Sequence, residues 1–75
     1  MEFDIDEIAR LIGRQLGIKD IEADDHLQED LGAESLDIQS IVATLEDRFG
    51  VMLEDEELFS IQTVRDLHSI LSRKL

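Results

Sequence analysis

Ser35 is the residue best placed to do chemistry, because it follows Glu34 and precedes Asp37 in the stretch DLGAESLD, residues 30–37. A serine at the start of a helix has two ordinary uses. Its side chain can cap the first N–H groups. Alternatively, its hydroxyl can carry a phosphate, since the unpaired N–H groups and the helix dipole favour anions there. The two carboxylates compete for the same field, so a phosphate at this position would need a covalent bond to hold it.

Catalysis by Ser35 itself is disfavoured. A Ser-His-acid triad needs a histidine within hydrogen-bond reach and an oxyanion hole. The two histidines are His26, in an acidic stretch, and His68, on an apolar stripe. The sequence GAES is not G-x-S-x-G, because Gly32 stands three places before the serine. The chain has no cysteine and therefore no thiol nucleophile. We expect no catalytic residue and a protein that is not an enzyme.

Residues 20–31, DIEADDHLQEDL, resemble a calcium-binding loop only in part. Carboxylates occupy the first, third and fifth positions. The sixth position, which requires glycine, is Asp25, and the twelfth, which requires a bidentate glutamate, is Leu31. Both diagnostic positions fail, so an EF-hand is not expected and no metal-ligating residue is assigned. Diffuse binding of divalent cations to the acidic residues stays open.

Three amphipathic helices are predicted from apolar residues at helical spacing. The first begins with Asp4 as N-cap, with Glu7 three residues later in a box-like arrangement, and ends before Gly17. The second runs from about Ser35 to Phe49 and ends at Gly50. The stripes are Ile5, Ile8, Ala9, Ile12 and Leu16 in the first helix, and Ile38, Ile41, Val42, Leu45 and Phe49 in the second.

The last helix is predicted to begin at Thr63, an N-cap with Asp66 as its N3 partner. Its stripe is Val64, Leu67, His68, Leu71 and Leu75. The acidic residues 51–62 suit one or two further helical turns. Residues 18–33 lack a sustained period and are expected to form a long loop, anchored to the core by Ile18, Ile21, Leu27 and Leu31.

These elements predict an all-α fold: a small four-helix bundle with three longer helices, a short third helix and a long loop between helices one and two. The 75 residues make one domain, 1–75. Its core would consist almost entirely of isoleucine, leucine, valine and phenylalanine. Such a core either simply holds the small domain together or opens to admit an aliphatic guest.

The net charge of −12 is carried by residues 18–62, because the charges before and after them cancel. Nucleic acids and anionic membranes would be repelled, and basic protein surfaces are the natural complement. No apolar run approaches the length needed to cross a membrane. The acidic start MEFDIDEIAR is unlike a signal peptide. A cytoplasmic location is therefore expected.

Residues 29–58, EDLGAESLDIQSIVATLEDRFGVMLEDEEL, resemble the centre of an acyl carrier protein. That family carries D-L-G-x-D-S-L-D before an amphipathic second helix, which ends in E-x-x-F and is followed by a short acidic segment. The matching residues are Asp30, Leu31, Gly32, Ser35, Leu36, Asp37, Glu46 and Phe49. SIQTVRDL, residues 60–67, resembles the family's entry to its last helix. The resemblance covers nearly the whole chain.

The resemblance implies that Ser35 Oγ receives 4′-phosphopantetheine from coenzyme A through a magnesium-dependent phosphopantetheinyl transferase. The thiol of this arm would hold acyl groups as thioesters, which explains how a carrier can lack cysteine. Acyl-transfer and chain-elongation enzymes of fatty-acid, lipid or polyketide biosynthesis would dock through basic patches onto a monomeric carrier. The residues matching the family's docking face, called the acidic face below, are Glu34, Leu36, Asp37, Glu46 and Asp47, extended by Asp55 and Glu56.

The chain departs from the family pattern at several positions while keeping the serine. Glu34 replaces the usual aspartate, and Arg48 adds a positive charge near the end of the acidic helix. Other departures are Ser40, Ala43 and the pair Leu53-Glu54. A specialised carrier is therefore at least as well supported as a housekeeping one. The alternatives are a peptidyl or aminoacyl carrier and an acidic helical adaptor without a prosthetic group.

Overall fold

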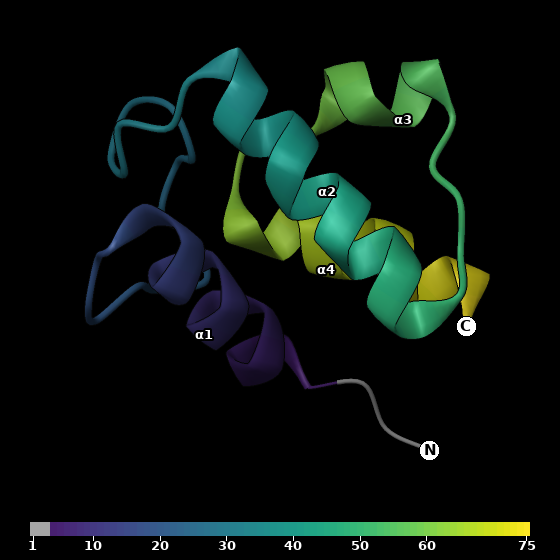
Figure 1. Ribbon diagram of the computed structural model, residues 1–75, viewed down its shortest axis with the longest axis horizontal. Helices are drawn as coiled ribbons and strands as arrows, with labels where there is room; N and C mark the ends of the chain where they lie inside the picture. The colour runs from purple at the N-terminus through teal and green to yellow at the C-terminus, as the bar shows by residue number, and fades with distance from the viewer. Residues whose placement is uncertain (1–3) are drawn as a thin grey trace.

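A computed structural model describes residues 4–75, which form four helices and no strand (Figure 1). They are α1, Ile5–Leu16; α2, Ser35–Phe49; α3, Asp55–Ser60; and α4, Val64–Lys74. The all-α class, the short third helix and the long loop before α2 are confirmed. The first three residues of the acidic start lie outside the described part of the chain. The assignment of residues 1–75 to a single domain stays a prediction.

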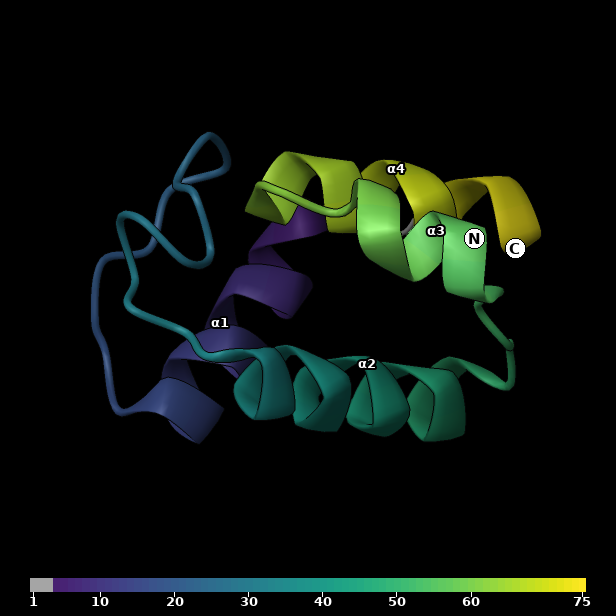
Figure 2. The same cartoon turned by 90° about the horizontal axis from the view of Figure 1, so that it is seen from above.

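The helices enclose one core from three sides. In Figure 2, α2 lies on one side and α3 and α4 lie on the other, while α1 connects the two sides and contacts both α2 and α4. Residues 17–34 loop around one end of this arrangement (Figures 1 and 2). The described residues measure 26 × 25 × 19 Å along their principal axes.

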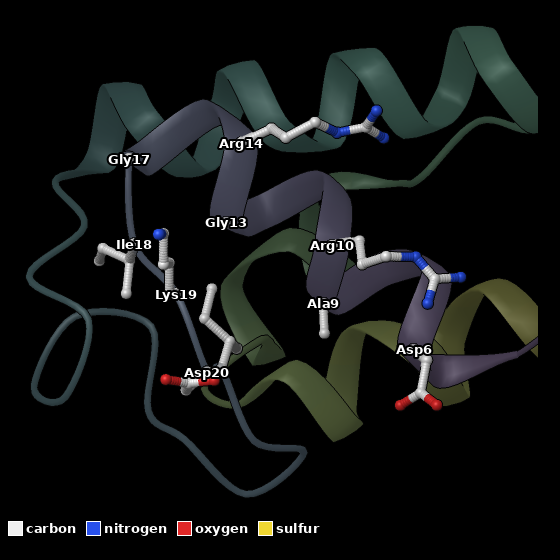
Figure 3. Close-up of a pocket in the computed structure, with 10 residues that line it drawn as sticks. Asp6, Ala9, Arg10, Gly13, Arg14, Gly17, Ile18, Lys19 and Asp20 are labelled. Atoms are coloured by element: carbon white, nitrogen blue, oxygen red, sulfur yellow. The ribbon is translucent and has the colours of Figure 1, made fainter.

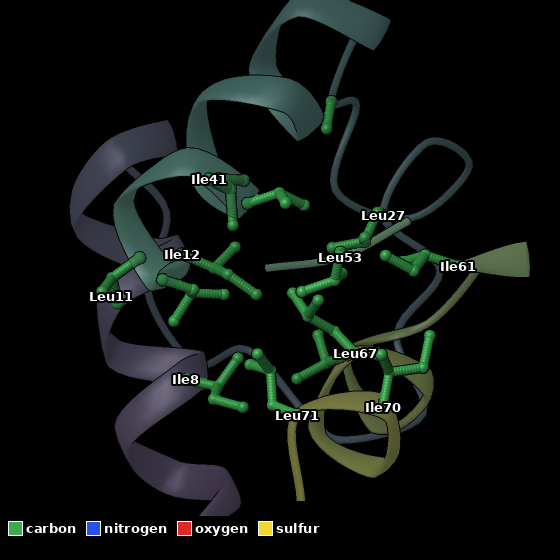
Figure 4. Packing of buried hydrophobic residues seen from close by; sticks show 14 residues of the cluster. Ile8, Leu11, Ile12, Leu27, Ile41, Leu53, Ile61, Leu67, Ile70 and Leu71 are labelled. Atoms are coloured by element: carbon green, nitrogen blue, oxygen red, sulfur yellow. The ribbon is translucent and has the colours of Figure 1, made fainter. Parts of the chain in front are cut away.

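The core is aliphatic (Figure 4). Ile8, Ile12, Leu45 and Leu71 are fully buried, and no polar side chain among residues 4–75 is buried with them. Burying one such side chain contributes roughly 1.5–3 kcal/mol. The other buried residues are Leu11, Leu27, Ala33, Ile41, Val42, Leu53, Ile61, Val64, Leu67 and Ile70.

The expectation of phenylalanine in the core is only partly met. Phe49 is half-buried at the end of α2 and packs against the core, whereas Phe59 on α3 is 88% exposed. The stripe predicted for the last helix also needs correction at its end. Leu75 is 60% exposed, and Ile70 is buried although it lies off the predicted stripe.

The helix ends follow the predicted chemistry with one change. Thr63 Oγ1 accepts a hydrogen bond from the Asp66 N–H at 3.1 Å, and Asp66 Oδ2 accepts one from the Thr63 N–H at 3.0 Å, which completes the predicted capping box. At α1, the Asp4 carboxylate accepts from the Asp6 N–H at 3.0 Å. The Glu7 N–H donates to the Asp4 carbonyl oxygen and not to the Asp4 carboxylate. The Asp4 side chain therefore caps the N–H of Asp6, whereas the box-like pattern predicted Glu7 as its partner.

The long loop is anchored by backbone hydrogen bonds as well as by apolar side chains. Leu27 is fully buried, and its N–H donates to the Gln62 carbonyl at 2.8 Å. The Arg65 N–H donates to the Ala23 carbonyl at 2.8 Å. Ile21 and Leu31 pack against the core as predicted. Ile18 does not pack against it, and this anchor is replaced by the buried Ala33.

The charges of the fold are mostly uncompensated, which predicts a response to salt. Among residues 4–75, two ion pairs form: Arg65 with Asp24 at 2.8 Å, and Lys74 with Glu57 at 2.9 Å. Because the net charge is −12, screening should relieve more repulsion than attraction. We expect the melting temperature, followed by circular dichroism, to rise by several degrees from low salt to about 0.5 M salt, with magnesium acting at lower concentration. A flat profile would contradict the repulsion argument.

Candidate functional site

Ser35 is the first residue of α2 and does not cap it. Glu34 occupies the N-cap position, with an extended backbone, and the Glu34 N–H donates to Asp37 Oδ2 at 2.9 Å. The Glu34 side chain turns toward the Asp37 N–H as the other half of a capping box. The capping interpretation of Ser35 is therefore wrong. Its side chain is exposed, and its hydroxyl makes no hydrogen bond within residues 4–75.

At the N-terminus of α2, Glu34 and Asp37 have the structural role of capping the helix, and Ser35 takes no part in it. Glu34 and Asp37 were expected to compete for the positive field at the start of the helix. In the structure, each of the two carboxylates is directed at the backbone N–H of the other residue. The hydroxyl of the serine between them is left exposed and without a hydrogen bond within residues 4–75. A hydroxyl group must be accessible and free of stronger partners before it can react.

The preceding D-L-G residues position Ser35, a role that sequence reasoning had not assigned to them. Asp30 Oδ2 accepts the His26 N–H at 2.7 Å and so holds the loop in a turn. Leu31 packs against the core. Gly32 has a φ of 69°, in the left-handed region that glycine enters without strain. Together these residues turn the chain into the first turn of α2.

A cavity of about 560 Å³ lies beside Ser35. This Ser35 cavity is bounded by the first turns of α2, by α3, by residues 26–29 of the loop and by the segment before α4. Leu27, Ile38 and Ile61 supply apolar walls. His26 also lines it, and the Nδ1 atom of that ring is buried without a hydrogen-bond partner.

A second and larger hollow, the α1 groove, does not include Ser35. It has a volume of about 800 Å³ and lies between α1 and residues 17–21 (Figure 3). Arg10, Arg14 and Lys19 line it, so it gathers three of the seven basic residues of the chain. Gly13 lets the loop approach, because a Cβ atom there would stand 2.6 Å from the Ile18 carbonyl oxygen. No serine, threonine or cysteine side chain lines this groove.

The acidic face divides into residues with a structural contact and residues without one. Asp37 belongs to the capping box, and Glu46 Oε2 accepts the Leu53 N–H at 2.7 Å, which ties the segment after α2 back to that helix. Glu34 is exposed but shares the capping box. Leu36 is 75% exposed. Asp47, Asp55 and Glu56 are also exposed and make no side-chain hydrogen bond within residues 4–75.

The arrangement offers a modifiable hydroxyl but no assembled triad. No hydrogen bond joins Ser35 to either histidine in the described part of the chain, and His68 Nε2 lies 3.5 Å from Ser72 Oγ on α4. No three histidine, aspartate or glutamate side chains of residues 4–75 converge as metal ligands. None of the described helices has the length and apolar character needed to span a membrane.

Comparison with known proteins agrees with this geometry. The family described as "Phosphopantetheine attachment site" matches residues 6–71. The chain is 34% identical over 71 residues to an acyl carrier protein of Solidesulfovibrio magneticus, covering 92% of this chain and 91% of that one. It is 38% identical over 69 residues to an acyl carrier protein of Syntrophobacter fumaroxidans, covering 89% and 85%.

The fold is shared with a solved structure from Mycobacterium tuberculosis that is assigned as an acyl carrier protein. The TM-score is 0.89 at 28% sequence identity, and the match covers 95% of this chain and 97% of that one. The matched region includes the D-L-G turn, Ser35 and all of α2. The chain therefore belongs to the acyl carrier proteins, which carry their cargo on covalently bound 4′-phosphopantetheine.

Proposed function

We propose that Ser35 Oγ is the attachment point of 4′-phosphopantetheine and that the chain is a carrier of acyl thioesters. The observation that carries this proposal is the exposed, unbonded hydroxyl at the first residue of α2, within the matched region. The residues present fit the group, because Ser35 itself lines a cavity of about 560 Å³ that has apolar walls and glutamine side chains. The bound group supplies a thiol that forms thioesters. Glu34 and Asp37 hold the end of α2 in place, and the D-L-G turn presents the hydroxyl.

In this proposal the chain is a substrate of other enzymes and not a catalyst. It receives its arm from a phosphopantetheinyl transferase and delivers acyl groups to enzymes of fatty-acid, lipid or polyketide biosynthesis. Arg48 and the other departures from the family pattern make a specialised pathway at least as well supported as a housekeeping one. A monomeric state, a cytoplasmic location and the absence of nucleic-acid partners stay predictions from charge and composition.

Loading of the arm tests the proposal directly. The purified chain is incubated with coenzyme A, magnesium and a broad-specificity phosphopantetheinyl transferase, and its intact mass is measured. We expect a gain of one phosphopantetheine group. An unchanged mass would instead favour an acidic adaptor without a prosthetic group. Loading with amino acids in place of acyl groups, tested with the corresponding adenylating enzymes, would indicate the aminoacyl carrier.

The acidic face is proposed as the docking surface for partner enzymes. The exposed members Leu36, Asp47, Asp55 and Glu56 offer both charge and apolar contact. Charge complementarity of this kind accelerates encounter and gives modest affinity, which suits a carrier that must leave each partner. The structural contacts of Asp37 and Glu46 make those two residues poor probes of docking, since their substitution would also disturb the fold.

Asp47→Lys isolates docking from folding. We expect it to lower kcat/KM for arm loading by roughly tenfold at low salt, with the effect shrinking as salt is added, because long-range attraction to a basic patch is screened. Helicity should be unchanged, since the Asp47 side chain makes no hydrogen bond within residues 4–75. Glu7→Lys makes the same charge change on α1 and is the control. Equal losses in both variants would show a general charge effect and count against a docking role.

A further inference from the structure

Several of the polar side chains around the Ser35 cavity are of one chemical type. Three of them are glutamines that come from separate segments: Gln28 from the loop, Gln39 from α2 and Gln62 from the segment before α4. Gln39 lies four residues after Ser35, so the two share one face of the helix. The cavity thus gathers primary amides directly beside the proposed attachment residue.

These amides are available for binding. None of the three glutamine side chains makes a hydrogen bond within residues 4–75. His26 lines the same cavity. Its Nδ1 atom is buried without a hydrogen-bond partner and is therefore not exposed to a ligand in the cavity.

The apolar part of the cavity rim is also unusual. Phe59 lines the cavity from α3 and is 88% exposed, although it is one of only three aromatic residues in the chain. Leu58, its neighbour, is half-buried against the core and lines the same cavity. A ligand that carried alkyl groups between polar groups would cover this surface while its polar groups met the amides.

The phosphopantetheine arm has this alternation. Between its phosphate and its thiol it carries geminal methyl groups, a hydroxyl and two amides. A glutamine side chain both donates and accepts hydrogen bonds, and so complements an amide in either direction. The carboxylates on the rim, Glu29 and Asp55, accept only, so they suit N–H and hydroxyl groups and oppose the phosphate.

We propose that Gln28, Gln39 and Gln62 bind the amide portion of the arm in the Ser35 cavity, with Phe59 covering its methyl groups. The arm is then held against the protein between α2 and α3. This inference rests on attachment at Ser35. It concerns the arm itself and not the cargo, because the groups that it matches are polar ones that an acyl chain lacks.

The test places a spin label on the loaded arm. Since the chain contains no cysteine, a methanethiosulfonate nitroxide reacts only with the arm thiol. We expect a broadened, slow-motion component in the electron paramagnetic resonance spectrum of the labelled wild type. In unlabelled samples, the side-chain amide signals of Gln39 and Gln62 should shift between the unloaded and loaded forms, and the methyl groups of the arm should give nuclear Overhauser effects to the Phe59 ring.

The double variant Gln39→Ala/Gln62→Ala should load fully, as judged by intact mass, yet give a spectrum whose slow component falls several-fold. Gln15→Ala, which removes an exposed glutamine from α1, should leave the spectrum unchanged. Melting curves of each variant serve as the check that it is folded. Free motion of the label in the wild type, or an unchanged spectrum in the double variant, would overturn the arm-binding proposal. A failure to load at all would instead contradict attachment at Ser35.

Discussion

Ser35→Ala should abolish the gain of mass on incubation with coenzyme A, magnesium and the transferase. The variant removes the oxygen that would form the phosphodiester bond, and no neighbouring hydroxyl takes its place in the first turn of α2. The same variant should keep the helicity of the wild type. Its unfolding free energy should differ from that of the wild type by less than about 0.5 kcal/mol. The reason is structural: the Glu34–Asp37 capping box fixes the helix end without the serine.

The control for this prediction is Ser40→Ala. Ser40 is exposed on the same helix, five residues further along, and its hydroxyl makes no hydrogen bond within residues 4–75. Its loading should match the wild type. Modification of Ser35→Ala to the wild-type extent would show that another side chain receives the group. Loss of folding in that variant would show that the capping box does not suffice to hold α2.

Leu45→Ala is expected to have the largest effect on stability. Leu45 lies on α2 and is fully buried in the core. Truncation of such a leucine costs about 2–5 kcal/mol, because the cavity that remains is only partly filled by relaxation. A domain of this size has a total stability of only about 4–11 kcal/mol. Urea unfolding should therefore show a much lower midpoint, or a population already unfolded in buffer.

Leu36→Ala makes the same chemical change on the same helix, at a side chain that is 75% exposed. It should change the unfolding free energy by less than about 0.5 kcal/mol. Because Leu36 belongs to the acidic face, the same variant should slow transfer to partner enzymes. If both leucine variants were equally destabilised, Leu36 would be a packing residue and its assignment to the docking surface would lose its support.

The extent of α2 could be predicted because its signals are local. The apolar residues of α2 follow helical spacing along its whole length. Gly50 adopts a φ of 66° just after the last residue of the helix, where glycine is favoured. The identity of the N-cap could not be predicted so simply. Serine is the better intrinsic cap, but Asp37 stands at the position from which it can accept the Glu34 N–H, and the helix begins one residue after Glu34 as a result.

Features that depend on contacts between distant segments could not be predicted from the sequence. The core was expected to include phenylalanine, but Phe59 lies on the six-residue α3 and its ring is exposed. The Ser35 cavity brings together Gln28, Gln39 and Gln62, whose spacing along the chain shows no motif. The resemblance to acyl carrier proteins indicated which serine to examine. Only the fold showed which side chains surround it.

One feature of the fold bears on how the Ser35 cavity opens. No residue of α3 is fully buried, and the helix is fastened at its edges, by Glu46 to the Leu53 N–H and by Glu57 to Lys74. Hydrogen bonds from the Glu54 N–H and from Lys74 hold the pKa of Glu57 below its ordinary value. The ion pair is therefore intact above that ordinary value and is lost as the pH falls through the lowered one. Acid strong enough to protonate Glu57 therefore removes the ion pair between α3, which forms one wall of the Ser35 cavity, and α4.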